Sequence, residues 1–142
     1  MKLTRGGEYG IRGVLYLARQ EEGKVSMLSA IAKAQDVPPR FLAKIFQALA
    51  KAGIVKSHRG AKGGFSLAKP SAEITIKDVI EAVEGPIHLN VCLIGDGECE
   101  RGKLCAMHPI WEDAQEKMVN VLARSNFADL VKAERQAETA AS

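Results

Sequence analysis

The sequence has no long hydrophobic run, and this absence excludes two classes of protein. No segment reaches the roughly eighteen consecutive apolar residues that a membrane-spanning helix needs. The opening residues, MKLTRGGEYG, lack the apolar stretch of a secretory signal peptide. Of the 142 residues, 46% are hydrophobic and 26% are charged, as is usual for a globular protein. We expect a cytoplasmic protein with no membrane partner.

The sequence also lacks recognisable catalytic motifs. It contains no Ser-His-Asp arrangement, no phosphate-binding glycine loop and no carboxylate pair at a spacing suited to acid–base chemistry, which argues against an enzyme. Cysteine is scarce, and all three cysteines lie within residues 92–108. An odd number of cysteines in a cytoplasmic chain argues against a disulfide framework and favours metal binding or redox chemistry.

The net charge is only +3, but the charges are unevenly distributed. Residues 1–70 contain 13 Lys and Arg and 4 Asp and Glu, a balance of +9. Residues 71–142 contain 7 Lys and Arg and 13 Asp and Glu, a balance of −6. A strongly basic half is expected to bind a polyanion, and nucleic acid is the most common one. We therefore expect residues 1–70 to bind double-stranded DNA.

Apolar spacing predicts three successive helices in the basic half. The first begins near Thr4. Its apolar stripe consists of Ile11, Val14, Leu15 and Ala18. The second covers residues 27–35, and Pro39 suits the first turn of a third helix that Gly53 can close. Two helices joined by a tight turn, after another helix, are typical of a helix-turn-helix.

The third predicted helix has two separate faces. Its apolar face, expected to pack on the first two helices, consists of Leu42, Ile45, Phe46 and Leu49. Its polar face consists of Arg40, Lys44, Gln47 and Lys51. No acidic residue interrupts the polar face, so we expect this face to contact DNA. A solvated charged surface is the alternative interpretation.

A short hairpin is predicted directly after the third helix. Residues 54–57 and 65–67 have the composition of two strands, and the glycine-rich turn between them carries His58, Arg59 and Lys62. A hairpin in this place is a wing, and a basic wing tip suits phosphate contacts or the minor groove. We expect these three residues to contact DNA, with a plain surface hairpin as the alternative.

The acidic half is predicted to contain two helices around the cysteine residues. Thr75 and Asp78 form a capping-box pattern before a short helix, and Pro109 can open a long helix that extends through Ala123. One face of the long helix consists of Trp111, Gln115, Met118 and Leu122. Beside it lie Ile110, Ala114 and Val121. This apolar surface is broad for a helix that projects from a small head.

The cysteine residues form the pattern Cys92-x6-Cys99-x5-Cys105-x2-His108. Three thiolates and one imidazole are a full set of four ligands. Structural zinc sites usually contain two cysteines about two to four residues apart, and neither cysteine gap here is that short. The loop also contains three glycines, which allow the chain to wrap around a larger inorganic group. The pattern favours an iron-sulfur cluster, with zinc as the alternative.

Three segments together resemble a known family. They are LTRGGEYGIRGVLYLA, PPRFLAKIFQALAKAGIVKSHRGAKGGFSLAKP and the cysteine loop, CLIGDGECERGKLCAMH. They are similar to the iron-sulfur winged-helix regulators typified by IscR and NsrR, over residues 2–131, and RG..GGF.L is the most specific element. The segment KAERQAETAAS lies beyond the resemblance, and we expect it to be frayed or disordered.

The resemblance implies a fold that is mainly α with a small β-hairpin wing. Residues 1–70 would form a winged helix-turn-helix head, and residues 71–142 would carry the cluster-binding loop (92–108) and a dimerisation helix, both within one integrated domain. The long C-terminal helix pairs two subunits in this family, which points to Trp111, Met118 and Leu122. A two-fold homodimer is suited to a palindromic DNA site.

The resemblance also implies a cofactor. In members of the IscR type the three cysteines and the histidine hold a 2Fe-2S cluster, which here points to Cys92, Cys99, Cys105 and His108. In members of the NsrR type a carboxylate of the partner subunit supplies the fourth ligand, and Glu8 matches its position. A 4Fe-4S cluster and zinc are the alternative cofactors. The implied function is transcriptional regulation in response to iron-sulfur status, redox state or nitric oxide. The alternative is a zinc-stabilised or thiol-based repressor without a cluster.

Overall fold

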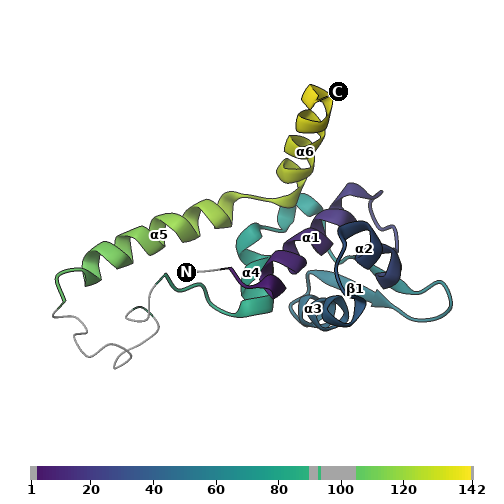
Figure 1. Cartoon of the computed structure of the whole chain (residues 1–142), viewed down its shortest axis with the longest axis horizontal. Helices are drawn as coiled ribbons and strands as arrows, with labels where there is room; N and C mark the ends of the chain where they lie inside the picture. Colours follow the sequence, from purple (N-terminus) through teal and green to yellow (C-terminus); the bar gives the residue numbers. More distant parts are fainter. Residues whose placement is uncertain (1–2, 90–92, 94–104, 142) are drawn as a thin grey trace.

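The computed structural model describes residues 3–89, 93 and 105–141 and is mostly helical with one β-hairpin, as predicted (Figure 1). The first part contains α1 (Arg5–Arg19), α2 (Leu28–Gln35), α3 (Pro39–Lys51), β1 (Val55–His58) and β2 (Gly64–Leu67). The second contains η1 (Ser71–Glu73), α4 (Ile76–Glu84), α5 (His108–Arg124) and α6 (Phe127–Ala141). Helices α1 to α4 and the hairpin form a head, and α5 extends away from it. Every helix in the described part of the chain is too short or too polar to cross a membrane.

The helix starts follow local signals in the sequence. The Thr4 hydroxyl caps α1 by accepting a hydrogen bond from the backbone N–H of Gly7 at 3.2 Å. Pro39 is the first residue of α3, and Gly53 follows the C-cap of this helix with a φ of 78°, a conformation that favours glycine. The capping box of α4 is present as predicted, since Thr75 and Asp78 bond each other's backbone N–H groups at 3.1 and 3.0 Å.

Helix α3 contributes the centre of the core. The predicted apolar residues are all buried and consist of Leu42, Ile45, Phe46 and Leu49. The Phe46 ring lies against Gly13 of α1, where an added Cβ would collide with it. The same ring meets the Phe65 ring edge to face, with 4.9 Å between the ring centroids. Phe46 therefore joins α3 both to α1 and to the hairpin.

The hairpin is attached to the head at its base. Strands β1 and β2 pair antiparallel, with Lys56 opposite Ser66. Phe65 and Ser26 exchange backbone hydrogen bonds of 2.8 and 2.9 Å, which ties β2 to the loop between α1 and α2. A Cβ at Gly64 would collide with the Ser26 carbonyl, so this close approach requires glycine.

Helix α6 corrects one expectation. The terminal segment was expected to be frayed or disordered, but residues 132–141 continue α6. Phe127 and Val131 are buried, and Arg19 of α1 forms ion pairs with Glu134 at 3.3 Å and Glu138 at 3.2 Å. These contacts hold α6 on the head, and the expectation was wrong because they join residues more than a hundred positions apart.

We predict that Gly13→Ala destabilises the head by about 1–3 kcal/mol, the usual cost of forcing an extra methyl group into a packed core. Urea denaturation followed by circular dichroism would measure this loss. Gly6→Ala is the matched control on the same helix. Its added Cβ would lie 3.4 Å from Val83, an ordinary contact distance, and alanine is a better helix former than glycine. Equal stabilities of the two variants would contradict the assigned packing of Phe46.

Candidate nucleic-acid interface and cysteine loop

The polar face of α3 is open to solvent. Its four predicted DNA-contacting residues are all exposed and consist of Arg40, Lys44, Gln47 and Lys51. Residues spaced by 4, 7 and 11 positions share one face of a helix, and the buried residues of α3 occupy the opposite face. The structure thus places three cations and one amide together on a surface that carries no acidic residue of α3.

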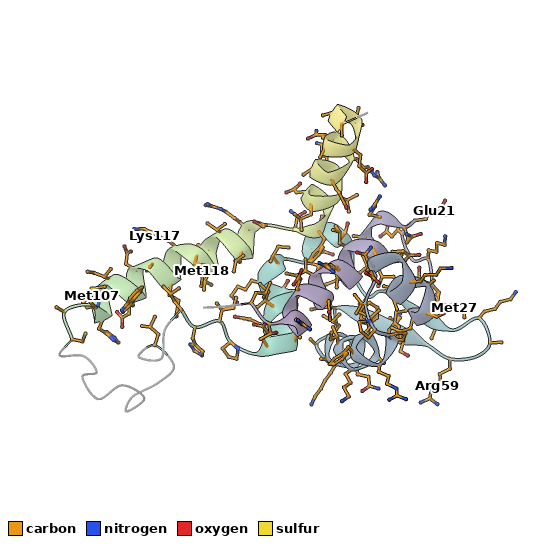
Figure 2. All side chains as sticks on the ribbon, in the orientation of Figure 1. Glu21, Met27, Arg59, Met107, Lys117 and Met118 are labelled. Carbon is orange, nitrogen blue, oxygen red and sulfur yellow. The ribbon has the colours of Figure 1, made fainter. Side chains whose placement is uncertain are left out.

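The wing adds exposed cations, but its histidine is engaged elsewhere. Arg59 and Lys62 are exposed at the tip of the hairpin. Figure 2 shows Arg59 pointing away from the body of the head, along the same lower edge as α3. His58 is only half exposed, and its Nε2 lies 2.8 Å from the Ser66 hydroxyl. His58 therefore links the two strands, and Arg59 and Lys62 are the exposed cations at the tip. Contact of these three residues with DNA stays a prediction.

A helix with one polar face and an adjacent basic hairpin has a shape suited to duplex DNA. The major groove admits an α-helix, and the N-terminal residues of a recognition helix approach the base edges. The narrow minor groove has a negative potential that favours Arg. The structure leaves both α3 and the wing tip free to approach DNA from one side of the head.

The cysteine loop is described only at its end. Cys92 and Cys99 lie outside the described residues. Cys105 is partly buried with a free thiol, and its carbonyl accepts a hydrogen bond of 3.1 Å from the backbone N–H of His108, the first residue of α5. Cys105 and His108 thus lie on one turn that leads into the long helix.

The His108 ring is held in one orientation. Its side chain is 13% exposed, and Nε2 lies 2.6 Å from a carboxylate oxygen of Glu112. Nδ1 is buried and has no hydrogen-bond partner among the described residues. A ring held through one nitrogen, with the other left without a partner, is the arrangement expected of a metal-ligating histidine whose carboxylate neighbour orients it.

Glu8, the alternative fourth ligand, has a partner of its own. Its carboxylate is half exposed and forms an ion pair of 2.7 Å with Arg12, one turn later on α1. Within the ranges that the structure describes, no three His, Cys, Asp or Glu residues are grouped closely enough to hold a metal ion. Because two of the predicted ligands lie outside those ranges, the ligand set stays a prediction.

The long helix α5 divides its apolar residues between two stripes. Trp111, Met118 and Leu122, the predicted dimer contacts, are partly buried by their own chain. On the same side Gln115 accepts a hydrogen bond of 2.8 Å from the backbone N–H of Leu89. Figure 2 shows Met118 pointing toward that segment and Lys117 pointing away from it.

The neighbouring stripe of α5 is the more exposed one. Ile110 is 57% and Val121 46% exposed. At about 100° per residue, both lie to one side of the stripe that contains Trp111 and Met118. On a third side of α5, the Asp113 carboxylate accepts a hydrogen bond of 2.7 Å from the Lys117 ammonium group. This hydrogen bond and the nearby charge raise the pKa of Lys117. The sequence showed the full width of the apolar surface but not which part its own chain covers.

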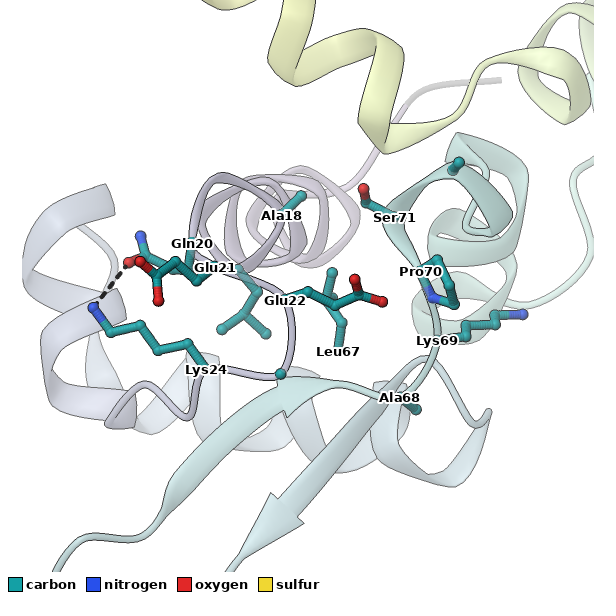
Figure 3. Close-up of a pocket in the computed structure, with 13 residues that line it drawn as sticks. Ala18, Gln20, Glu21, Glu22, Lys24, Leu67, Ala68, Lys69, Pro70 and Ser71 are labelled. Carbon is teal, nitrogen blue, oxygen red and sulfur yellow. Dashed lines mark hydrogen bonds between the residues drawn. The ribbon is translucent and has the colours of Figure 1, made fainter.

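The head also contains a pocket that no sequence motif predicted. It has a volume of about 380 Å³ and lies between the end of α1, the loop after it and the segment that follows β2 (Figure 3). Leu17 and Leu67 line it, together with Glu21, Glu22 and Lys24. This mixed lining is unsuited to a polyanion, so we do not include the pocket in the nucleic-acid interface.

Comparisons with known proteins agree with this geometry. A family model described as Rrf2, an iron-dependent transcriptional regulator, matches residues 3–133. The chain is 37% identical over 131 residues to a Haemophilus influenzae protein named as an HTH-type transcriptional regulator, covering 92% of this chain and 87% of that one. It is 32% identical over 131 residues to the regulator IscR of Klebsiella pneumoniae, covering 92% and 80%.

Solved structures share the fold. IscR of T. potens superposes with a TM-score of 0.77 and 28% identity, over 96% of this chain and 90% of that one. CymR, described as the global cysteine regulator of B. subtilis, superposes with a TM-score of 0.76 and 28% identity, over 94% and 98%. IscR and a protein described as a cysteine regulator thus share this fold, so the fold does not by itself specify a cofactor.

We predict that Lys44→Ala and Arg59→Ala each weaken binding to duplex DNA. Loss of a phosphate contact lowers the slope of log affinity against log salt by about 1, and loss of a base contact costs about 1–3 kcal/mol on the preferred sequence only. Fluorescence anisotropy over a salt series would distinguish the two. Lys132→Ala removes an exposed cation from α6 and should keep the wild-type slope. A folded double variant with wild-type affinity and slope would remove both residues from the interface.

Proposed function

Because the chain belongs to the Rrf2 family of transcriptional regulators, we propose that it is a homodimeric regulator whose affinity for DNA is controlled by an iron-sulfur cluster. Helix α3 enters the major groove and the wing contacts the adjacent backbone or minor groove. The exposed polar face of α3 and the cationic wing tip support this docking. Two copies related by a two-fold axis would read a palindromic operator.

The observation that carries the cluster assignment is the environment of His108. Its Nδ1 is buried without a partner among the described residues while Nε2 is held by Glu112, so the ring has one nitrogen available for a metal. Cys105 precedes it on the same turn. We assign Cys92, Cys99, Cys105 and His108 as the ligands, with Glu8 of the partner subunit as the alternative to His108.

Iron-sulfur ligation suits this donor set better than zinc. The gaps of six and five residues between the cysteines are wider than in most structural zinc loops, and cysteine thiolates are the usual ligands of iron-sulfur clusters. The similarity to IscR supports a 2Fe-2S cluster. Such a cluster would supply a group that is gained, lost or oxidised as conditions change. The alternative function is a zinc-stabilised or thiol-based DNA-binding repressor.

Helix α5 provides a physical connection between the loop and the head. It begins at His108 and ends at Arg124. Just beyond it, Ser125 accepts a hydrogen bond of 2.9 Å from Ile76, and Phe127 donates one of 3.0 Å to Ile74. These bonds attach the end of α5 to the start of α4. A change at His108 therefore acts on a helix whose other end is tied to the head.

Dimerisation would cover the exposed stripe of α5. Ile110 and Val121 lie on this side of the helix and are exposed, and burial of such apolar surface favours association. Trp111, Met118 and Leu122 adjoin the stripe and are already partly covered. We therefore place Ile110 and Val121 at the centre of the proposed subunit contact and the three predicted residues at its edge.

We predict that Val121→Glu converts the dimer into a monomer, because a charge without a partner is costly in an apolar contact. Sedimentation velocity would measure the change, and DNA affinity should fall with it. Asn120→Glu adds the same charge at an exposed position on another face of α5 and should leave the dimer intact. A dimeric Val121→Glu protein would mean that the subunits meet elsewhere.

For the cluster, we predict that protein purified without oxygen contains iron and sulfide and absorbs visible light. Cys105→Ala should abolish this absorption, since thiolates bind the cluster directly. His108→Ala should retain a cluster with an altered spectrum, because water or another ligand can occupy the open position. His88→Ala removes a histidine outside the motif whose Nδ1 is likewise buried without a partner among the described residues; it should preserve the wild-type spectrum, because the assignment of His108 requires its place beside Cys105 as well.

The regulatory link requires a second measurement. DNA affinity should differ between cluster-bound and cluster-free protein at one salt concentration by about 5- to 150-fold, the usual range for allosteric coupling. If the protein binds zinc and no iron under conditions that reconstitute iron-sulfur clusters, the alternative function, a zinc-stabilised repressor, would be supported. Equal affinities of the two forms for every operator would show that the cluster does not control DNA binding.

A further inference from the structure

Phe41 is exposed on the proposed DNA-binding helix. Its side chain is 62% exposed, the highest value among the large hydrophobic residues that the structure describes. It is the third residue of α3, next to Arg40 and one turn before Lys44 and Ile45. Two of the other exposed large hydrophobic residues, Ile110 and Val121, lie on α5, where the proposed subunit contact would cover them.

The fold does not need Phe41 for packing. The core of α3 is completed by Leu42, Ile45, Phe46 and Leu49, which are at most 6% exposed. Counting about 100° per residue, Phe41 lies between this buried face and the polar face that carries Lys44. An aromatic ring in that place adds apolar surface beside the cations of α3, so this side of the helix offers a ligand both charge and an apolar contact.

The surrounding charge identifies the kind of ligand. Arg40, Lys44 and Lys51 are exposed on the adjacent face, and α3 contains no acidic residue. A second copy of this surface would bring like charges together, whereas DNA would neutralise them. A partner that contacts Phe41 must therefore be anionic and must present an apolar group.

We propose that Phe41 contacts the C5-methyl group of a thymine in the major groove and so selects that base. This inference rests on the proposed docking of α3. Residues at the N-terminus of a recognition helix approach the base edges, and Phe41 lies in the first turn of α3. A phenyl ring has no hydrogen-bond donor or acceptor, so it distinguishes bases only by apolar contact. The thymine methyl is the apolar group that the major groove presents.

Uracil substitution tests this contact. An operator is first selected from random duplex DNA with the wild-type dimer, and each thymine is then replaced in turn by deoxyuridine, which lacks only the methyl group. At one thymine in each half-site, wild-type affinity should fall by about four-fold, equivalent to about 0.8 kcal/mol for one buried carbon. Phe41→Ala should bind the thymine and uracil duplexes equally at that position.

Two control variants separate this contact from general effects. Phe41→Leu keeps an apolar side chain and should retain most of the discrimination. Met27→Ala removes another exposed hydrophobic side chain of the head, at the N-cap of α2, and should retain all of it. Because the Phe41 side chain is mostly exposed, both variants at this position should keep the wild-type circular dichroism spectrum.

Three results would overturn the inference. If no uracil substitution lowers the affinity of the wild-type protein, the protein makes no contact with a thymine methyl group. If Phe41→Ala weakens binding but keeps the discrimination, another residue reads the methyl group. If the wild-type dimer selects no operator at all, the proposed function fails together with this contact, whereas the first two results leave DNA binding by α3 intact.

Discussion

The burial of the Phe46 ring against α1 and the wing is the contact on which the candidate DNA-binding surface depends. Phe46 is fully buried and contacts both Gly13 and the edge-to-face ring of Phe65. These contacts determine how α3 lies relative to α1 and to β2. Because α3 and the wing share this core residue, their spacing is a property of the core rather than of the exposed side chains that would contact DNA.

The proposed regulation requires a change in the cysteine loop to reach this head. The hydrogen bonds after α5 attach it to the start of α4, and Glu84 at the end of α4 accepts a hydrogen bond of 2.7 Å from the backbone N–H of Thr4 at the start of α1. The described residues thus form a continuous path from His108 to the helix that packs against Phe46. In a dimer, a small change at α5 would alter the spacing of two heads without unfolding either one.

Local signals explain how much of the fold was predictable. The faces of α3 follow from its apolar period, and the capping box at Thr75 follows from two residues three positions apart. Helix α6 was not predicted, because Arg19 pairs with Glu134 and Glu138 only after α1 and α6 come together. The spacing of the cysteine motif indicated a metal site, whereas the hydrogen bond that holds the His108 ring on Glu112 appears only in the folded chain.

The sequence by itself determined the helix-turn-helix, the wing, the basic surface and the width of the apolar face on α5, since each depends on spacing within one segment. Only the tertiary structure decided which side chains remain available. In the folded chain His58 is hydrogen-bonded to Ser66, and the Phe41 side chain is exposed to solvent. Met118 on α5 is partly buried, whereas Val121 is exposed. The physical reason is that periodicity defines the faces of a helix, whereas the elements packed against it determine which face stays open to a partner.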